Sequence, residues 1–234
     1  MNYLTIEKIF KKNSPLFLLK IFVPTVAFLA VVYAIGKTNG ISFGYLSRDA
    51  IQTLWHEPNA EVEYYIGFLS NLGIVFWCFT AAILFLSSKI AKDLRRPRPL
   101  YQFLFLSGLL TLFMLVDDLF LLHDVIIPYY LEISEKVFYL FYGCAVLALL
   151  YFYRGIILNS DYFLFLLAFA FMASSVVTDV LLTLGINISD IYLFEDGFKF
   201  LGIISWFVYF TRTSYVNIRP TDTQQILVPK DLIN

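Results

Sequence analysis

Long apolar stretches alternate with short polar segments along the whole chain. Six such stretches stand out, and each is close to the roughly 20 residues that an α-helix needs to cross a bilayer. Polar segments containing glycine or proline end several of them, as at 37–40 and 95–99. The pattern predicts an all-α integral membrane protein, a bundle of about six transmembrane helices, at about residues 16–36, 64–88, 100–122, 137–157, 162–185 and 194–214.

Composition agrees with this prediction. Hydrophobic residues make up 59% of the chain and charged residues 15%, whereas soluble domains carry roughly 25% charged residues. Six crossings use nearly all of the 234 residues. We therefore expect a single polytopic membrane domain over 1–234, with an outer loop at 37–63 and a short cytoplasmic tail at 215–234.

Lysines and arginines predict the orientation of the helices. If the N-terminus is cytoplasmic, thirteen of the seventeen basic residues fall on the cytoplasmic side, as the positive-inside rule requires. Both termini are then cytoplasmic, and a bacterial cytoplasmic membrane is the default location. The basic loop at 89–98 fits this rule better than a nucleic-acid patch. Membrane lipids are the expected partners, with no nucleic acid.

The acidic residues show the opposite bias, and this bias needs a separate cause. Thirteen of the eighteen lie on or near the outer side, yet carboxylates influence topology little. Counting along each helix at 1.5 Å per residue places Asp117, Asp179 and Glu195 together, roughly 25 Å up a core about 30 Å thick. Asn71 falls in the same layer, and Lys199 lies one turn deeper, where it is the expected counter-ion.

Carboxylates in this layer are costly to hold there without partners. An ionised Asp well inside the hydrocarbon costs about 2.5–3.5 kcal/mol and normally pairs or faces a cavity. We therefore expect one outward-facing pocket, and its candidate catalytic residues are Asp117, Asp118, Asp179, Glu195 and Lys199. On a regular helix His123 points away from the face that carries Asp117 and Asp124.

The same residues also predict a metal site. Several carboxylates and one histidine suit Mg, Mn, Ca, Fe or Zn, so a divalent metal is a candidate cofactor. Its expected ligands are Asp117, His123, Asp124, Asp179 and Glu195. Both cysteines lie within apolar segments, which argues against a cysteine-based metal motif or a disulfide.

Three classes of function remain open at this stage. The first is a membrane-embedded enzyme, such as a hydrolase, that acts on a lipid or lipid-linked substrate, and we rank it slightly first. The second is a proton- or cation-coupled transporter or channel. The third is a non-catalytic assembly or sensor protein, in which the charged layer is a buried salt-bridge network that fixes helix register.

The placement of the layer is similar to that in transmembrane hydrolases of the alkaline ceramidase and adiponectin-receptor type. Those proteins combine Ser, Asp and His residues around zinc near one membrane face. The present sequence differs from them in having six expected helices instead of seven and no HxxxH motif in the last one. It is therefore not assigned to that group.

The outer loop contains one segment with its own predicted structure. Residues 47–55 can form a short amphipathic helix, and Ser47 is suited to be its N-cap. Such a helix would lie on the outer surface above the charged layer.

Overall fold

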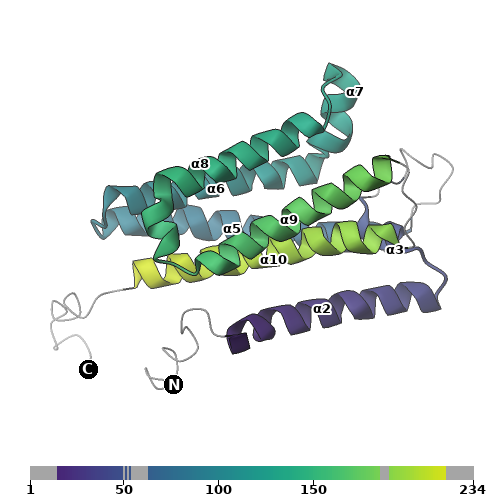
Figure 1. Cartoon of the computed structure of the whole chain (residues 1–234), viewed down its shortest axis with the longest axis horizontal. Helices are drawn as coiled ribbons and strands as arrows, with labels where there is room; N and C mark the ends of the chain where they lie inside the picture. Colours follow the sequence, from purple (N-terminus) through teal and green to yellow (C-terminus); the bar gives the residue numbers. More distant parts are fainter. Residues whose placement is uncertain (1–14, 50, 52, 54–62, 185–189, 220–234) are drawn as a thin grey trace.

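All elements described in the structure are helices (Figure 1). This computed structural model describes residues 15–49, 51, 53, 63–184 and 190–219. The prediction of an all-α fold is confirmed. The elements are α2 (Pro15–Thr38), α3 (Phe43–Ser47), α5 (Phe68–Asp93), α6 (Arg98–Phe120), the π-helical turn η1 (Leu122–Ile126), α7 (Ile127–Leu131), α8 (Lys136–Leu158), α9 (Tyr162–Thr183) and α10 (Ile191–Ile218).

The long helices lie side by side and alternate in direction, which gives the bundle two distinct ends (Figure 1). The connections at 94–97 and 159–161 and the end of α10 lie at one end, which we call the basic end. The segment α3, the turn η1, α7 and the start of α10 lie at the other, which we call the acidic end. Six carboxyl groups gather around a cavity at the acidic end, and three arginines line a cavity at the basic end.

Five of the described helices are long and apolar enough to cross a membrane. They are α2, α5, α6, α8 and α9, so the protein has the composition of a multi-pass membrane protein. The sixth long helix, α10, has 28 residues but does not meet the same criteria. It carries four charged residues, at positions 195, 196, 199 and 212. The number of six crossings and the cytoplasmic placement of the termini stay predictions.

The core is built around α10, which contacts α2, α3, α5 and α9. Close approach between α9 and α10 depends on Gly202, where a Cβ atom would lie 2.7 Å from Cγ of Met172 and 3.2 Å from the carbonyl oxygen of Ala168. Any larger residue would force the two helices apart. Next to this contact, Phe165 and Trp206 are fully buried between the helices.

Apolar side chains also cover much of the outer surface. In α8, Leu140 is 68% exposed and Phe152 is 73% exposed, while few residues of this helix are buried. In α2 the buried residues are limited to Leu29, Val32 and Gly36. Such surfaces would be unfavourable in water but suit contact with lipid tails.

The third long helix ends earlier than its sequence pattern predicts. The stretch 100–122 predicts one regular helix, but α6 ends at Phe120 because Leu121 adopts a left-handed conformation with φ of 51°. This conformation costs a residue with a side chain roughly 1–2 kcal/mol. The side chain of Asp117 stabilises the break, since its Oδ1 accepts a hydrogen bond from the backbone N–H of His123 at 2.9 Å.

The prediction that Ser47 is the N-cap of a surface helix is wrong. Ser47 is the last residue of α3, and Ser42 occupies the N-cap position. Gly67 allows α3 to pack closely on the start of α5, because it has a positive φ of 76° and its N–H donates to the carbonyl of Tyr45 at 3.0 Å. Residues 50, 52 and 54–62 of the predicted outer loop, and 220–234 of the predicted tail, lie outside the described residues.

Candidate functional site

A cavity of about 160 Å³ lies at the acidic end of the bundle. Side chains from α5, α6, η1, α8, α9 and α10 line it together with Arg48. The structure brings all the candidate residues of the sequence analysis into this one lining: Asp117, Asp118, His123, Asp124, Asp179, Glu195 and Lys199. The segments α6, η1, α9 and α10 therefore bring these polar groups into one cavity, although this convergence does not assign a role to any of them.

Asp117 is the most deeply buried acid in the cavity wall, with 1% of its surface exposed. Besides the backbone N–H of His123, it accepts a hydrogen bond from the hydroxyl of Tyr142 on α8. Its Oδ2 also lies 2.8 Å from Nδ1 of His123. A carboxylate with several donors can be held in the interior at an acceptable cost.

His123 lies between two aspartates. Its Nδ1 contacts Asp117, and its Nε2 lies 3.2 Å from Oδ1 of Asp124. Burial lowers the pKa of the imidazole, but the contact with Asp117 and the negative charge of Asp124 outweigh burial and raise the pKa to about 9. The expectation that His123 points away is wrong, because the break at Leu121 reorients the chain that follows.

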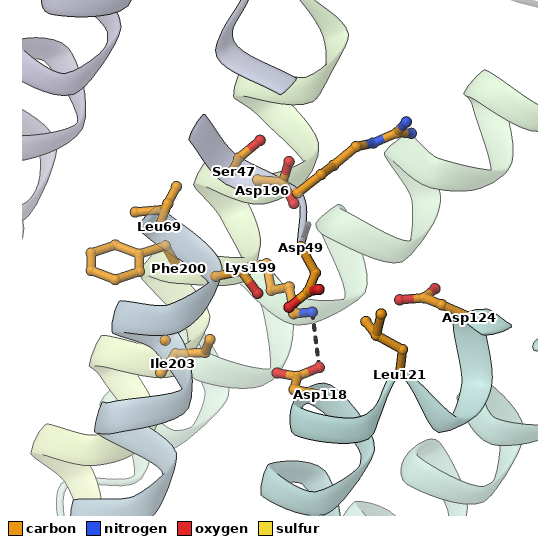
Figure 2. Close-up of a pocket in the computed structure, with 13 residues that line it drawn as sticks. Ser47, Asp49, Leu69, Asp118, Leu121, Asp124, Asp196, Lys199, Phe200 and Ile203 are labelled. Atoms are coloured by element: carbon orange, nitrogen blue, oxygen red, sulfur yellow. Dashed lines mark hydrogen bonds and ion pairs between the residues drawn. The ribbon is translucent and has the colours of Figure 1, made fainter. Parts of the chain in front are cut away.

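Lys199 pairs across helices with Asp118, as Figure 2 shows. The Nζ–Oδ1 distance is 2.9 Å, and the second oxygen of Asp118 accepts a hydrogen bond from Nε1 of Trp77 at 2.8 Å. The sequence predicts Lys199 as the counter-ion of the buried acids without choosing one of them, and the structure pairs it with Asp118 on α6.

Two tyrosines of α8 belong to the site although the sequence analysis did not include them. Tyr139 donates to Oδ2 of Asp179 at 3.1 Å, and Tyr142 donates to Asp117. Their spacing of three residues places both hydroxyls on one face of the helix. That spacing was the available signal, but in a chain with 19% aromatic residues it does not stand out.

The charges around the cavity are unbalanced. Six carboxyl groups line it, from Asp117, Asp118, Asp124, Asp179, Glu195 and Asp196. The basic groups in the lining are Lys199, Arg48 and His123, and the guanidinium of Arg48 also stacks on the ring of Tyr192 at 4.1 Å. Oε2 of Glu195 and Oδ2 of Asp196 are buried without a hydrogen-bond partner among the described residues. Buried carboxylates of this kind require protons or a bound cation.

A second hollow, of about 40 Å³, adjoins the cavity beneath α3. Asp118, Asp124, Asp196 and Lys199 line both spaces, and Figure 2 shows Asp196 beside Ser47 at the upper edge of this hollow. Asn71, which depth counting placed in the same layer, is exposed and is absent from both linings.

Towards the basic end the wall of the cavity becomes apolar. Met114, Met172 and Ile203 form part of the lining there. Deeper still, Trp206 is fully buried and donates through Nε1 to Oγ1 of Thr111 at 3.0 Å. The described residues therefore form a cavity backed by a packed core, which differs from a continuous pore.

The geometry does not support the predicted metal centre. Among the residues that the structure describes, no group of three or more His, Cys, Asp or Glu side chains is placed to hold a metal ion. The expected ligands point to other partners: Asp117 to Tyr142 and His123, and Asp179 to Tyr139. Protein donors thus already engage Asp117 and one oxygen of Asp179, two of the predicted ligands.

Comparison with known proteins identifies the family. The chain belongs to the family described as Domain of unknown function (DUF8692), whose model matches residues 22–213. No curated protein and no solved structure matches the chain. The matched range includes every residue of the acidic cavity lining.

Proposed function

We propose that the protein binds a small organic cation in the acidic cavity and functions as a proton-linked carrier for it. The observation that carries this proposal is the excess of carboxyl groups over Lys199, Arg48 and His123 in the lining. An ammonium group offers only donors, so it complements the unpartnered oxygens of Glu195 and Asp196. A cavity of about 160 Å³ has room for such a group.

Proton linkage follows from the surroundings of these carboxyls. Away from water, a carboxylate without a partner is more stable in its protonated form. Entry of a cation reverses this preference, and the displaced protons leave the site. Binding of the cation is then coupled to proton release, which is the elementary step of cation–proton exchange.

The closed base of the cavity supports a carrier over a channel. A channel needs a continuous polar path, whereas a carrier in one of its states opens its site towards one side only. The apolar wall at Met114 and the buried Trp206 behind it suit the second case.

A membrane-embedded enzyme is a second candidate, favoured by the pair of Asp117 and His123. A buried aspartate in contact with an imidazole nitrogen is an arrangement that orients histidine for acid–base catalysis. Its substrate would be a lipid that reaches the cavity from the membrane. Against this candidate, both nitrogens of His123 already lie beside carboxylates.

Binding of methylammonium and of ethanolamine to the purified full chain tests the proposal. We expect saturable binding with release of protons into a weakly buffered solution, measured with a pH-sensitive dye. Glu195→Gln and Asp196→Asn should each weaken binding about tenfold, since each removes a charged acceptor. Asp93→Asn is the matched control, because this exposed carboxylate lies on α5 at the basic end.

Reconstituted liposomes then separate the two candidates. Uptake of the labelled amine driven by a proton gradient supports the carrier. Chemical conversion of an added lipid, lost in His123→Gln and without amine uptake, supports the enzyme instead. Absence of amine binding in a correctly folded preparation would falsify the proposal.

A further inference from the structure

A larger cavity, of about 620 Å³, lies at the basic end. It is formed where the start of α6 meets the ends of α8 and α10, and Figure 1 shows the last turns of α8 bending towards α9 at this end. The bend follows Tyr153, whose backbone is not helical. Three arginines line the cavity, and its one lining carboxylate among the described residues is Asp161.

Arg96 is held in this cavity by the way α5 ends. Arg95 has a left-handed backbone conformation with φ of 53°. Its N–H donates to the carbonyl oxygen of Lys92 at 3.0 Å, and the N–H of Arg96 donates to the carbonyl oxygen of Ala91 at 2.9 Å. These two bonds form a Schellman motif, which fixes the backbone at Arg96. Its Nη2 donates to the carbonyl of Arg219 at 2.8 Å, while Nε is buried without a partner among the described residues.

The carboxylate of the cavity is already engaged. Asp161 accepts from Nε of Arg212 at 2.7 Å, and the guanidinium of Arg212 stacks on the ring of Phe17 at 3.9 Å. Arg212 is only 4% exposed. Because this pair neutralises itself, the remaining charge of the lining comes from Arg96 and Arg219.

The rest of the lining suits an amphipathic ligand. Asn159, Ser160 and Asn217 offer polar groups, whereas Leu100 and Val216 are apolar. The helix ends at which they lie are the level at which lipid headgroups meet the hydrocarbon. Basic pockets between helices at this level are suited to phosphate-bearing headgroups.

We infer that the basic-end cavity is a binding site for a phosphate group, carried by an anionic lipid headgroup or by a soluble phosphate compound. Arginine side chains match the planar, multi-acceptor geometry of phosphate better than any other residue. The orphaned Nε of Arg96 supplies a donor that such an anion would satisfy. This inference is independent of the carrier function proposed for the acidic end.

Native mass spectrometry of the full chain in detergent tests the site. Phosphatidylglycerol is titrated beside diacylglycerol, which lacks the phosphate, and glycerol 3-phosphate is titrated as the soluble probe. We expect phosphatidylglycerol to bind at least tenfold more tightly than diacylglycerol, and Arg96→Ala to reduce that preference about tenfold. The matched control is Arg98→Ala, since Arg98 is exposed at the same end but does not line the cavity.

The binding results distinguish a lipid headgroup from a soluble phosphate and include results that overturn the inference. Binding of the lipid alone that depends on Arg96 identifies a lipid headgroup site, and equal binding of glycerol 3-phosphate identifies a site for a soluble phosphate. Equal losses in Arg96→Ala and Arg98→Ala would indicate general surface attraction and overturn the inference. Arg219→Ala gives a second test if Arg96→Ala does not fold, because it should also weaken binding, and an unchanged affinity in it overturns the inference as well.

Discussion

The two ends of the bundle solve the problem of buried charge in different ways. At the acidic end, six carboxyl groups share Lys199, Arg48 and His123, and aromatic side chains donate hydrogen bonds to three of the acids. At the basic end, the lining carboxylate of Asp161 forms a largely buried ion pair with Arg212. The carboxyl groups of the acidic end therefore share several basic and aromatic donors. At the basic end one ion pair, Asp161–Arg212, holds the lining carboxylate and contributes to stability.

The largest difference is expected when one partner of each ion pair is removed. Asp161→Leu removes the carboxylate that pairs with the buried guanidinium of Arg212, and should lower the free energy of unfolding by about 3–5 kcal/mol. Asp118→Leu should cost less, about 2 kcal/mol, because the side chain of Lys199 is 39% exposed and can be solvated, while Nε1 of Trp77 loses its acceptor. Unfolding in detergent with increasing dodecyl sulfate measures both. Equal losses would contradict the distinction between the two ends.

A smaller effect is expected from pH, through His123 at the acidic end. The pKa of His123 lies above its ordinary value of 6.5, at about 9. The protonated imidazole therefore stabilises the fold fully below pH 6.5, and this contribution, of about 3 kcal/mol, is lost as the pH rises through 9.

The melting temperature in detergent between pH 6 and pH 10 measures this contribution. The wild-type melting temperature should fall over this range. His123→Gln should start lower and depend less on pH. A wild-type profile that stays flat, or that rises with pH, contradicts the assignment of a protonated His123 between Asp117 and Asp124.

The smallest effect is expected from a pair of matched tyrosine substitutions. Tyr139→Phe removes a hydrogen bond to the carboxylate of Asp179. Tyr209→Phe removes a hydrogen bond between the hydroxyl groups of Tyr209 and Ser160. We expect losses of about 2 and about 1 kcal/mol, because bonds to charged groups contribute more. The same detergent unfolding assay compares them, and a larger loss at Tyr209 would reverse the proposed contrast.

Depth along regular helices was enough to predict which acids lie together. Each of the three helices has its acid, Asp117, Asp179 or Glu195, at a similar number of residues from the basic end. Because an α-helix rises by a fixed distance per residue, similar residue counts place these acids at a similar depth in the bundle. Length and apolarity likewise predicted six spans, of which five are long and apolar enough in the structure to cross a membrane. These are properties of single helices, so no knowledge of packing was needed.

What could not be predicted depends on contacts between segments. A left-handed Leu121 has no signal in the sequence, because leucine rarely adopts this conformation and is here compensated by Asp117 and the turn that follows. The role of Lys199 as a counter-ion of the buried acids was predicted, but the choice of Asp118 among them depends on how α6 is placed relative to α10.

The close contact at Gly202 distinguishes the two walls of the acidic cavity. Asp179 on α9 and Lys199 on α10 are attached to helices whose backbones meet at this glycine, so the distance between these two elements is nearly constant. On the opposite wall, α8 buries few residues, and the hydroxyl groups of Tyr139 and Tyr142 link it to the acids of the cavity. The acidic cavity therefore lies between one wall fixed by backbone contact and one wall attached through two tyrosine hydroxyls, so replacing Gly202 would disturb the more tightly packed wall.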